Sequence, residues 1–204
     1  MIKTTLKRIF AIVGSSLAII AAVFYLILSI KAISYVSSWM STTENVFLIL
    51  SFLLSFALAF FFTFFGIKAL FGFLNKEGKD EPFVIIALCF SAFQFIMTLF
   101  TLIFFGSAAI LWLLLVFSLV ATITLLLHVT GLRVTLYTDV VGITASLVTA
   151  VAAAVTGDGL TLAANVIIAI SFFAVMSIFA LHLIKDAPAE EPKTENSDDF
   201  NSEE

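Results

Sequence analysis

Two carboxamide side chains, Gln94 and Asn165, are the residues whose type and position could do chemistry within the long apolar segments of this chain. Gln94 lies in an uncharged run that begins at Phe83, and Asn165 lies about one turn into the last apolar segment. Amides can donate and accept hydrogen bonds, and such bonds between membrane helices contribute about 1 kcal/mol. We expect polar contacts within the membrane from both residues, either between helices or to a substrate.

The other chemistry-bearing residues are sparse and lie mostly near the ends of apolar segments. His128 and His182 are the only histidines, and two imidazoles on neighbouring helices could ligate a haem iron from opposite faces. Interfacial histidines without such a role are the more common case. Cys89 has no second cysteine with which to form a disulfide. Arg133 and Asp139 share one short link and can pair. We therefore predict no catalytic, cofactor-binding or metal-binding residues.

Several motifs typical of membrane enzymes and transporters are missing from the sequence. No ionisable residue lies near the expected middle of a membrane-spanning segment, where coupled transporters usually carry one. The chain also lacks a phosphate-binding glycine loop and a zinc-binding His-Glu-x-x-His motif. These absences favour a protein that is not an enzyme.

The elements that position these side chains are predicted from the apolar runs. Hydrophobic residues make up 62% of the chain, and no Asp, Glu, Lys or Arg occurs from Phe83 to Leu127. As one helix that run would be about 67 Å long, whereas the hydrocarbon core of a membrane is about 30 Å thick. It must fold back, and Gly106 with Ser107 is the turn signal near its middle.

The fold class we predict is all-α, a polytopic integral membrane helix bundle of about six transmembrane helices. The transmembrane domain covers residues 1–185, with spans at about 9–30, 46–67, 83–105, 108–128, 140–156 and 160–184. Span 140–156 is the shortest of the six, and incomplete crossing of the membrane is the alternative for this segment. Residues 186–204 are polar and acidic, so we expect a disordered tail.

The distribution of Lys and Arg predicts the orientation of the six spans, because cytoplasmic loops carry an excess of these residues. One side holds Lys31 alone, and the other holds Lys3, Lys7, Arg8, Lys68, Lys76, Lys79, Arg133 and Lys185. We expect a multi-pass protein of the cell membrane with both termini cytoplasmic. High Phe and low Pro content suggest a bacterial source. We expect no nucleic-acid partner, because the sequence has no concentrated cluster of basic residues.

Small and weakly polar residues recur along the spans at steps that alternate between four and three residues. This spacing keeps one seam facing a neighbouring helix, and small residues let membrane helices approach closely. The first span carries Ala11, Ser15, Ala18, Ala22, Tyr25 and Ser29; the third carries Ala87, Ser91, Gln94, Thr98 and Thr101; the fifth carries Gly142, Ser146, Thr149 and Ala153. We interpret these stripes as helix–helix seams, with a polar pore or pocket lining as the alternative.

The second span differs, because its small residues recur strictly at steps of four. They are Ser51, Ser55, Ala59 and Thr63, and a ridge of Phe52, Phe56, Phe60 and Phe64 runs beside them. We predict that the small residues form another seam. The phenylalanine ridge is expected to face lipid or fill gaps between helices, with an aromatic-lined ligand site as the alternative.

The leading functional hypothesis is an accessory, assembly or regulatory subunit that acts through helix–helix contacts with a membrane-protein partner or a second copy. The alternative is a substrate-binding membrane subunit of a small-molecule transporter. In size and span count the chain is similar to the substrate-capture subunits of energy-coupling-factor transporters, whose first helix carries Ala-x-x-x-Ala; Ala18 and Ala22 have this spacing. A pocket that opens to the outer side and is lined by Gln94 and Asn165 would favour the transporter class.

Overall fold

The computed structural model describes residues 2–37, 40–75, 78–106, 108–131, 136–157 and 159–185. Within these residues all of the regular secondary structure is helical. The helices are α1 (Ile2–Ser34), α2 (Thr42–Leu74), α3 (Glu81–Phe105), α4 (Ala109–Val129), α5 (Leu136–Thr156) and α6 (Gly159–Lys185). In this part of the chain, six helices are long and apolar enough to cross a membrane. The chain is thus all-helical and consistent with a multi-pass membrane bundle.

The helices extend the predicted spans, mostly outward. Each span lies within one helix, except that Ala108 precedes the first residue of α4. The largest extensions are in α1 and α2, which have 33 residues each and so measure about 50 Å. Helices of this length exceed the hydrocarbon thickness of about 30 Å, so they must tilt or emerge from it. The predicted tail, residues 186–204, lies outside the described residues.

Local signals explain where several helices begin and end. Ser41 and Glu44 form a capping box at the start of α2, in which each side chain bonds the backbone N–H of the other residue. Pro82 occupies the first turn of α3, where its missing N–H costs nothing. Gly106 ends α3 with a φ of 93°, a conformation that glycine adopts without a steric penalty.

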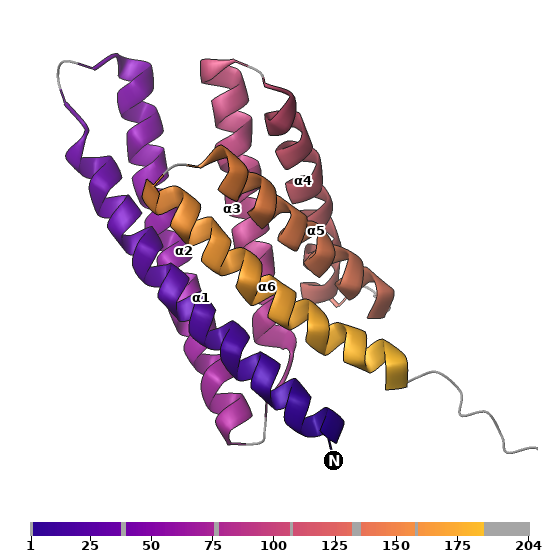
Figure 1. Ribbon diagram of the computed structural model, residues 1–204. Coiled ribbons are helices and arrows are strands. Elements are labelled where there is room, and N and C mark those ends of the chain that lie inside the picture. The colour runs from indigo at the N-terminus through magenta and orange to yellow at the C-terminus, as the bar shows by residue number, and fades with distance from the viewer. Residues whose placement is uncertain are drawn as a thin grey trace, which may run out of the picture.

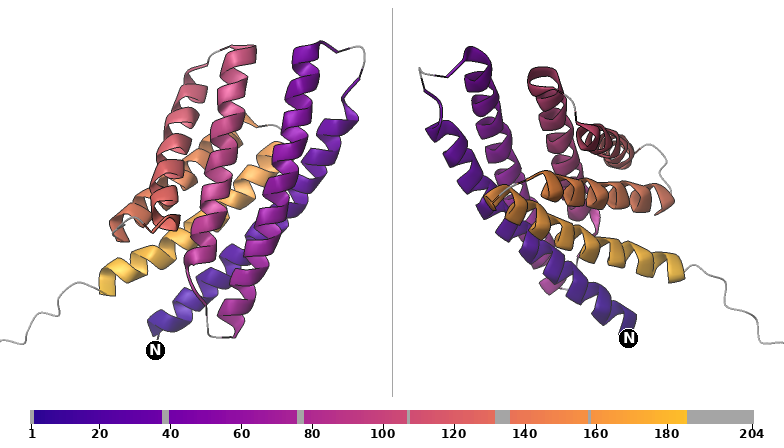
Figure 2. Two further views of the ribbon diagram at one scale, coloured as in Figure 1. Left: turned by 180° about the vertical axis from the view of Figure 1, so that it is seen from behind. Right: turned by 45° about the horizontal axis from the view of Figure 1, so that its top comes forward.

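The six helices form a closed ring in chain order, in which each helix packs against the next and α6 packs against α1. An additional contact between α3 and α5 crosses the ring. The N-terminus and the end of α6 lie at one end of the bundle, and the α1–α2 and α3–α4 connections lie at the other, here called the loop end (Figure 1). Helices α5 and α6 are tilted relative to α2 and α3 (Figure 2).

The predicted seams of the first, third and fifth spans are the contact faces of their helices. Every residue of the α1 stripe is at most 2% exposed, and the α5 stripe is buried throughout. On α3 the stripe is buried from Ala87 to Thr98, and Thr101 is half-buried. Gly142 shows how close the approach is, since a Cβ there would lie 2.6 Å from Leu125 of α4. The prediction of packing seams is confirmed for these helices.

The seam prediction for the second span is wrong at its ends. Ser55 and Ala59 are buried, but Ser51 is half-buried and Thr63 is exposed. Successive residues are about 100° apart around a helix, so each step of four advances the ridge by about 40°. Three steps carry Thr63 about 120° away from Ser51. The contact face continues instead through Phe62 and Gly66.

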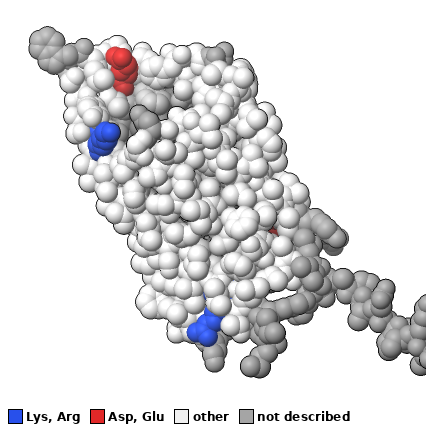
Figure 3. All heavy atoms as spheres, viewed as in Figure 1, with Lys and Arg blue, Asp and Glu red and all other residues white. Residues whose placement is uncertain are grey.

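The phenylalanine ridge of α2 lies on the outer surface of the bundle. Phe56, Phe60 and Phe64 are 51%, 62% and 56% exposed, as expected for side chains that face lipid. The space-filling view shows one face that is almost free of charge, with described charged residues near its two ends (Figure 3). This pattern matches an apolar belt between two polar boundaries.

Candidate ligand pocket at the loop end of the bundle

Four helices meet at a buried polar cluster formed by Tyr25, Gln94 and Asn165, here called the polar node. The Tyr25 hydroxyl on α1 donates a hydrogen bond to Asn165 Oδ1 on α6 at 2.8 Å. Gln94 Nε2 on α3 lies 3.5 Å from the same oxygen. Asn165 Nδ2 donates to the Ala153 carbonyl on α5 at 3.2 Å. Asn165 therefore links α1, α3 and α5 to α6.

Two aromatic contacts hold the Tyr25 ring in place. The ring meets Phe62 of α2 and Phe93 of α3 edge to face, with centroid distances of 5.9 and 5.6 Å. Tyr25 is 2% exposed. Such edge-to-face pairs contribute about 0.5–1.5 kcal/mol beyond the area that they bury. The hydroxyl is thus held at a defined position relative to the amides.

The polar node forms the floor of a pocket with a volume of about 310 Å³. This volume is at the lower end of the range of about 300–1,000 Å³ that is typical of small-molecule sites. The pocket is lined by residues of α1, α2, α3, α5 and α6 and of the links that follow α1 and α5: Tyr25, Leu28, Lys31, Ala32, Tyr35, Ser51, Ser55, Phe93, Gln94, Met97, Ala153, Thr156, Gly157, Thr161 and Asn165.

The pocket is open because the tilted α5–α6 pair does not fill the loop end of the bundle. The turn between these helices stops short of the level reached by the α1–α2 and α3–α4 connections (Figures 1 and 2). Ala153, Thr156 and Thr161, from the end of α5 and the start of α6, form one wall. The small side chains Ser51 and Ser55 of α2 contribute to the lining.

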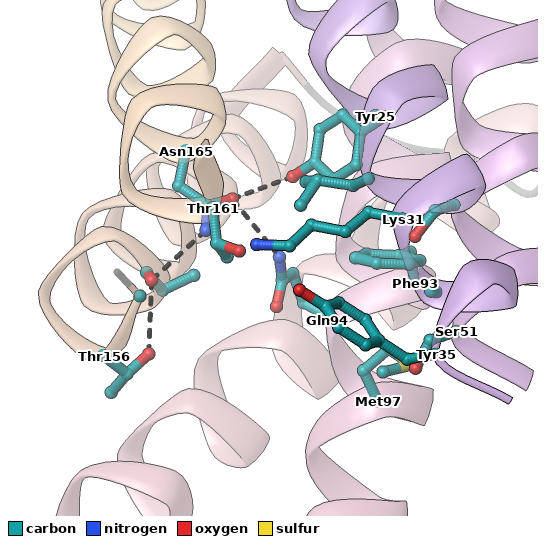
Figure 4. A pocket seen from close by; sticks show the side chains of 15 residues that line it. Tyr25, Lys31, Tyr35, Ser51, Phe93, Gln94, Met97, Thr156, Thr161 and Asn165 are labelled. Carbon is teal, nitrogen blue, oxygen red and sulfur yellow. Dashed lines mark hydrogen bonds between the residues drawn. The ribbon is translucent and has the colours of Figure 1, made fainter. Parts of the chain in front are cut away.

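Lys31 brings a positive charge to this pocket from the last turn of α1. Its Nζ lies 5.9 Å from the centroid of the Tyr35 ring. Such a cation–π contact contributes about 0.5–1 kcal/mol at an exposed site. The Lys31 side chain reaches across the pocket toward Thr161 (Figure 4). Within the described residues no carboxylate lies within 4.0 Å of Lys31.

Glu44 is the carboxylate that the described residues place at this end of the bundle, and it bonds to Ser41, not to Lys31. Its Oε2 accepts hydrogen bonds from the Ser41 N–H at 2.9 Å and from the Ser41 hydroxyl at 2.7 Å. Described pocket-lining residues include no Asp, Glu, His or Cys. Lys31 is therefore the single formal charge that the described residues place on the pocket lining.

The structure brings together the two amides that the sequence selected as candidates for polar contacts. Sequence reasoning placed Tyr25 in a packing stripe, so it missed the part that Tyr25 and Tyr35 play here. Lys31 also carried a signal, since it is the one basic residue on the side of the membrane predicted to be external. What the sequence could not show is that these residues converge on one cavity.

His128, Asp139 and Cys89, which the structure describes, are not part of the pocket lining. His128 Nδ1 of α4 lies 2.7 Å from Asp139 Oδ1 of α5, so Asp139 pairs with a histidine; Arg133, its expected partner, lies outside the described residues. The His182 side chain also lies outside them. Cys89 is a half-buried free thiol. No group of three or more His, Cys, Asp or Glu that could hold a metal ion occurs among the described residues.

No protein-family model, curated protein or solved structure matches this chain. The function is therefore inferred from the geometry of the pocket and from the distribution of charged residues.

Proposed function

We propose that this chain is a non-enzymatic membrane protein that binds a small molecule in the loop-end pocket, as the substrate-binding membrane subunit of a transporter would. The observation that carries the proposal is the convergence of Gln94, Asn165 and Lys31 on one cavity of about 310 Å³. A mostly apolar cavity with a few oriented polar groups is the usual form of a ligand site. No carboxylate, imidazole or thiol lies among its described lining residues to act as a general base or nucleophile.

The orientation of the pocket supports the same proposal. Lys7, Arg8, Lys68 and Lys79 lie at the end opposite the pocket, which we assign to the cytoplasm by the excess of basic residues. In a bacterial cell membrane the pocket would then open to the exterior. A solute could enter it without crossing the bilayer first.

An accessory role through helix–helix contacts is the second candidate, and one observation favours it. A crevice of about 240 Å³ between α1 and α2 is lined by the exposed Val23, Phe60 and Thr63 and by the buried small residues Ala22 and Ala59. A partner helix could approach closely there. The seams of α1, α3 and α5 are already buried within this chain, so they support this role less than they did from the sequence.

The proposal is tested by identifying what the purified protein carries. Ser55 lies on the pocket lining and is 6% exposed, whereas Leu53, two residues away on the same helix, is 56% exposed on the outer surface. Ser55→Phe should fill the pocket, and Leu53→Phe should leave it intact. Protein purified in mild detergent is analysed by untargeted small-molecule mass spectrometry.

We expect a small molecule to be enriched with the wild type and Leu53→Phe and to be lost from Ser55→Phe. Circular dichroism should show that all three proteins are folded. Identical small-molecule profiles for the wild type and Ser55→Phe would contradict the proposed function. Co-purification of a membrane protein that Ala59→Leu releases and Ser55→Phe retains would support the accessory role instead.

A further inference from the structure

The charge balance of the pocket indicates what kind of molecule would enter it. The described residues place one formal charge on the lining, the Lys31 ammonium, and no acidic side chain. Taking an ammonium group out of water without an opposing charge is costly. A ligand that closes over Lys31 must therefore supply a negative charge, or it must leave the ammonium in contact with water.

The backbone near Lys31 adds to this preference. Helix α6 begins at Gly159, and its first turn, which includes Thr161, borders the pocket. Helix N-termini carry a partial positive charge that favours anions. The carbonyl groups at the C-terminus of α5 carry the opposite partial charge, which disfavours anions. One of them is partly compensated, because Ala153 O accepts hydrogen bonds from Asn165 Nδ2 at 3.2 Å and from Thr156 Oγ1 at 3.2 Å.

The rest of the lining suits a compact apolar body. Leu28, Phe93 and Met97 contribute apolar surface, and the Tyr35 ring lies beside the Lys31 ammonium. Figure 4 shows the Tyr35 and Phe93 rings on the side of the pocket that faces away from α6. A planar body could lie against these rings while its charged group meets Lys31.

The polar node limits how many additional polar groups the ligand can carry. Asn165 Oδ1 already accepts from Tyr25 and approaches Gln94 Nε2, and Asn165 Nδ2 already donates to Ala153. The Gln94 carbonyl oxygen has no hydrogen bond among the described residues and remains as an acceptor at the floor. One ligand donor group at the far end from the charge would satisfy it.

We infer that the pocket selects a small organic monoanion, a carboxylate on a compact, partly apolar body, with its charged group on Lys31. This inference rests on the proposed binding function and names the ligand class of the same site. It disfavours organic cations, because a second positive charge in the pocket would be repelled by the Lys31 ammonium.

Benzoate, benzamide and benzamidine test the inference, because they share one shape and are anionic, neutral and cationic at neutral pH. Each is added at millimolar concentration to the full-length protein in detergent, and thermal unfolding is followed by circular dichroism. We expect a clear upward shift with benzoate, a smaller one with benzamide and none with benzamidine. Lys31→Gln should reduce the benzoate shift to that of benzamide, and Lys31→Arg should retain the preference for benzoate.

The outcomes separate the ligand class from the binding function. Equal shifts with all three compounds that Ser55→Phe abolishes would overturn the anionic class and leave the pocket as a binding site. A benzoate shift that survives in Lys31→Gln would overturn the role of Lys31. No shift with benzoate would also overturn the inference, while the small-molecule analysis of Ser55→Phe decides the proposed function separately. Because Lys31 is exposed at the end of α1, its replacement should not prevent folding.

Discussion

Replacement of Asn165 by Leu should destabilise the bundle more than any other single change at the polar node. Asn165 joins three helices to α6 through contacts of 2.8, 3.2 and 3.5 Å. In Asn165→Leu the Tyr25 hydroxyl loses its acceptor and the Ala153 carbonyl loses a donor. The substitution thus removes bonds and also leaves the buried Tyr25 hydroxyl without its acceptor, whereas the Ala153 carbonyl keeps the Thr156 hydroxyl as a donor.

The magnitude follows from the two shorter bonds. Hydrogen bonds between membrane helices average about 0.6 kcal/mol each, with a maximum near 1.7 kcal/mol. A buried donor left without an acceptor costs about 1–3 kcal/mol. Tyr25 is 2% exposed, so its stranded hydroxyl should fall within this range. We expect Asn165→Leu to lower the free energy of unfolding by about 2–3 kcal/mol.

A double-mutant cycle separates the hydrogen bond from simple repacking. Tyr25→Phe removes the hydroxyl and leaves Asn165 its contact with Gln94, so it should cost about 1 kcal/mol. In the double variant no tyrosine hydroxyl is stranded. The combined loss should therefore be smaller than the sum of the single losses by about 1 kcal/mol.

The assay is unfolding of the purified protein in mixed micelles of increasing SDS content, followed by circular dichroism. Val166→Leu is the matched control, because Val166 is the next residue on α6 and is 41% exposed. It should change the free energy of unfolding by less than about 0.5 kcal/mol. The reasoning is refuted if Asn165→Leu costs no more than Val166→Leu, or if the two single losses are simply additive.

Three further predictions concern packing and topology. Gly66→Ala should lower the free energy of unfolding by about 1–3 kcal/mol, because a Cβ there would lie 2.8 Å from Ile19 Cγ1. Gly72→Ala is the control in the same SDS titration, because the nearest atom to a Cβ at Gly72 would be 3.4 Å away. Equal losses for the two variants would contradict the close approach of α1 and α2. Reporter fusions should be active outside the cell after residue 157 and inside after residue 185; an external reporter at the second position would show that the chain crosses the membrane an odd number of times. Truncation after Lys185 should leave detergent stability unchanged, since the removed residues are polar and acidic; a lower unfolding temperature would show that the tail contributes to the fold.

Much of the fold could be predicted because its signals are local. Apolar length identified six helices, and the alternating four-and-three spacing correctly identified the buried faces of α1, α3 and α5. The same reasoning was wrong at the ends of the second span, since a strict step of four turns gradually away from the partner helix. Gly66, which the sequence stripe did not include, marks a close approach of α1 and α2, since a Cβ there would lie 2.8 Å from Ile19 Cγ1.

The candidate site shows the limit of sequence reasoning. Gln94 and Asn165 were identifiable because an amide is costly within an apolar helix unless it finds a partner. Lys31 stood out only as the one basic residue on the side predicted to be external, and no sequence signal connected Lys31 or Tyr35 with a site. Their role depends on where the last turn of α1 lies relative to the α5–α6 turn, which is more than a hundred residues away along the chain.

The sequence by itself determined the helices, the buried faces of α1, α3 and α5 and the scarcity of charge between the two ends, because hydrophobicity and periodicity act over a few turns of one helix. Only the tertiary structure decided that the helices close into a ring, that Asn165 links Tyr25, Gln94 and Ala153, and that the tilted α5–α6 pair leaves a pocket beneath Lys31. Helix tilt and the voids it leaves result from the fit of side chains on different helices. That fit depends on contacts between residues distant in the chain, so no pattern within one segment contains it.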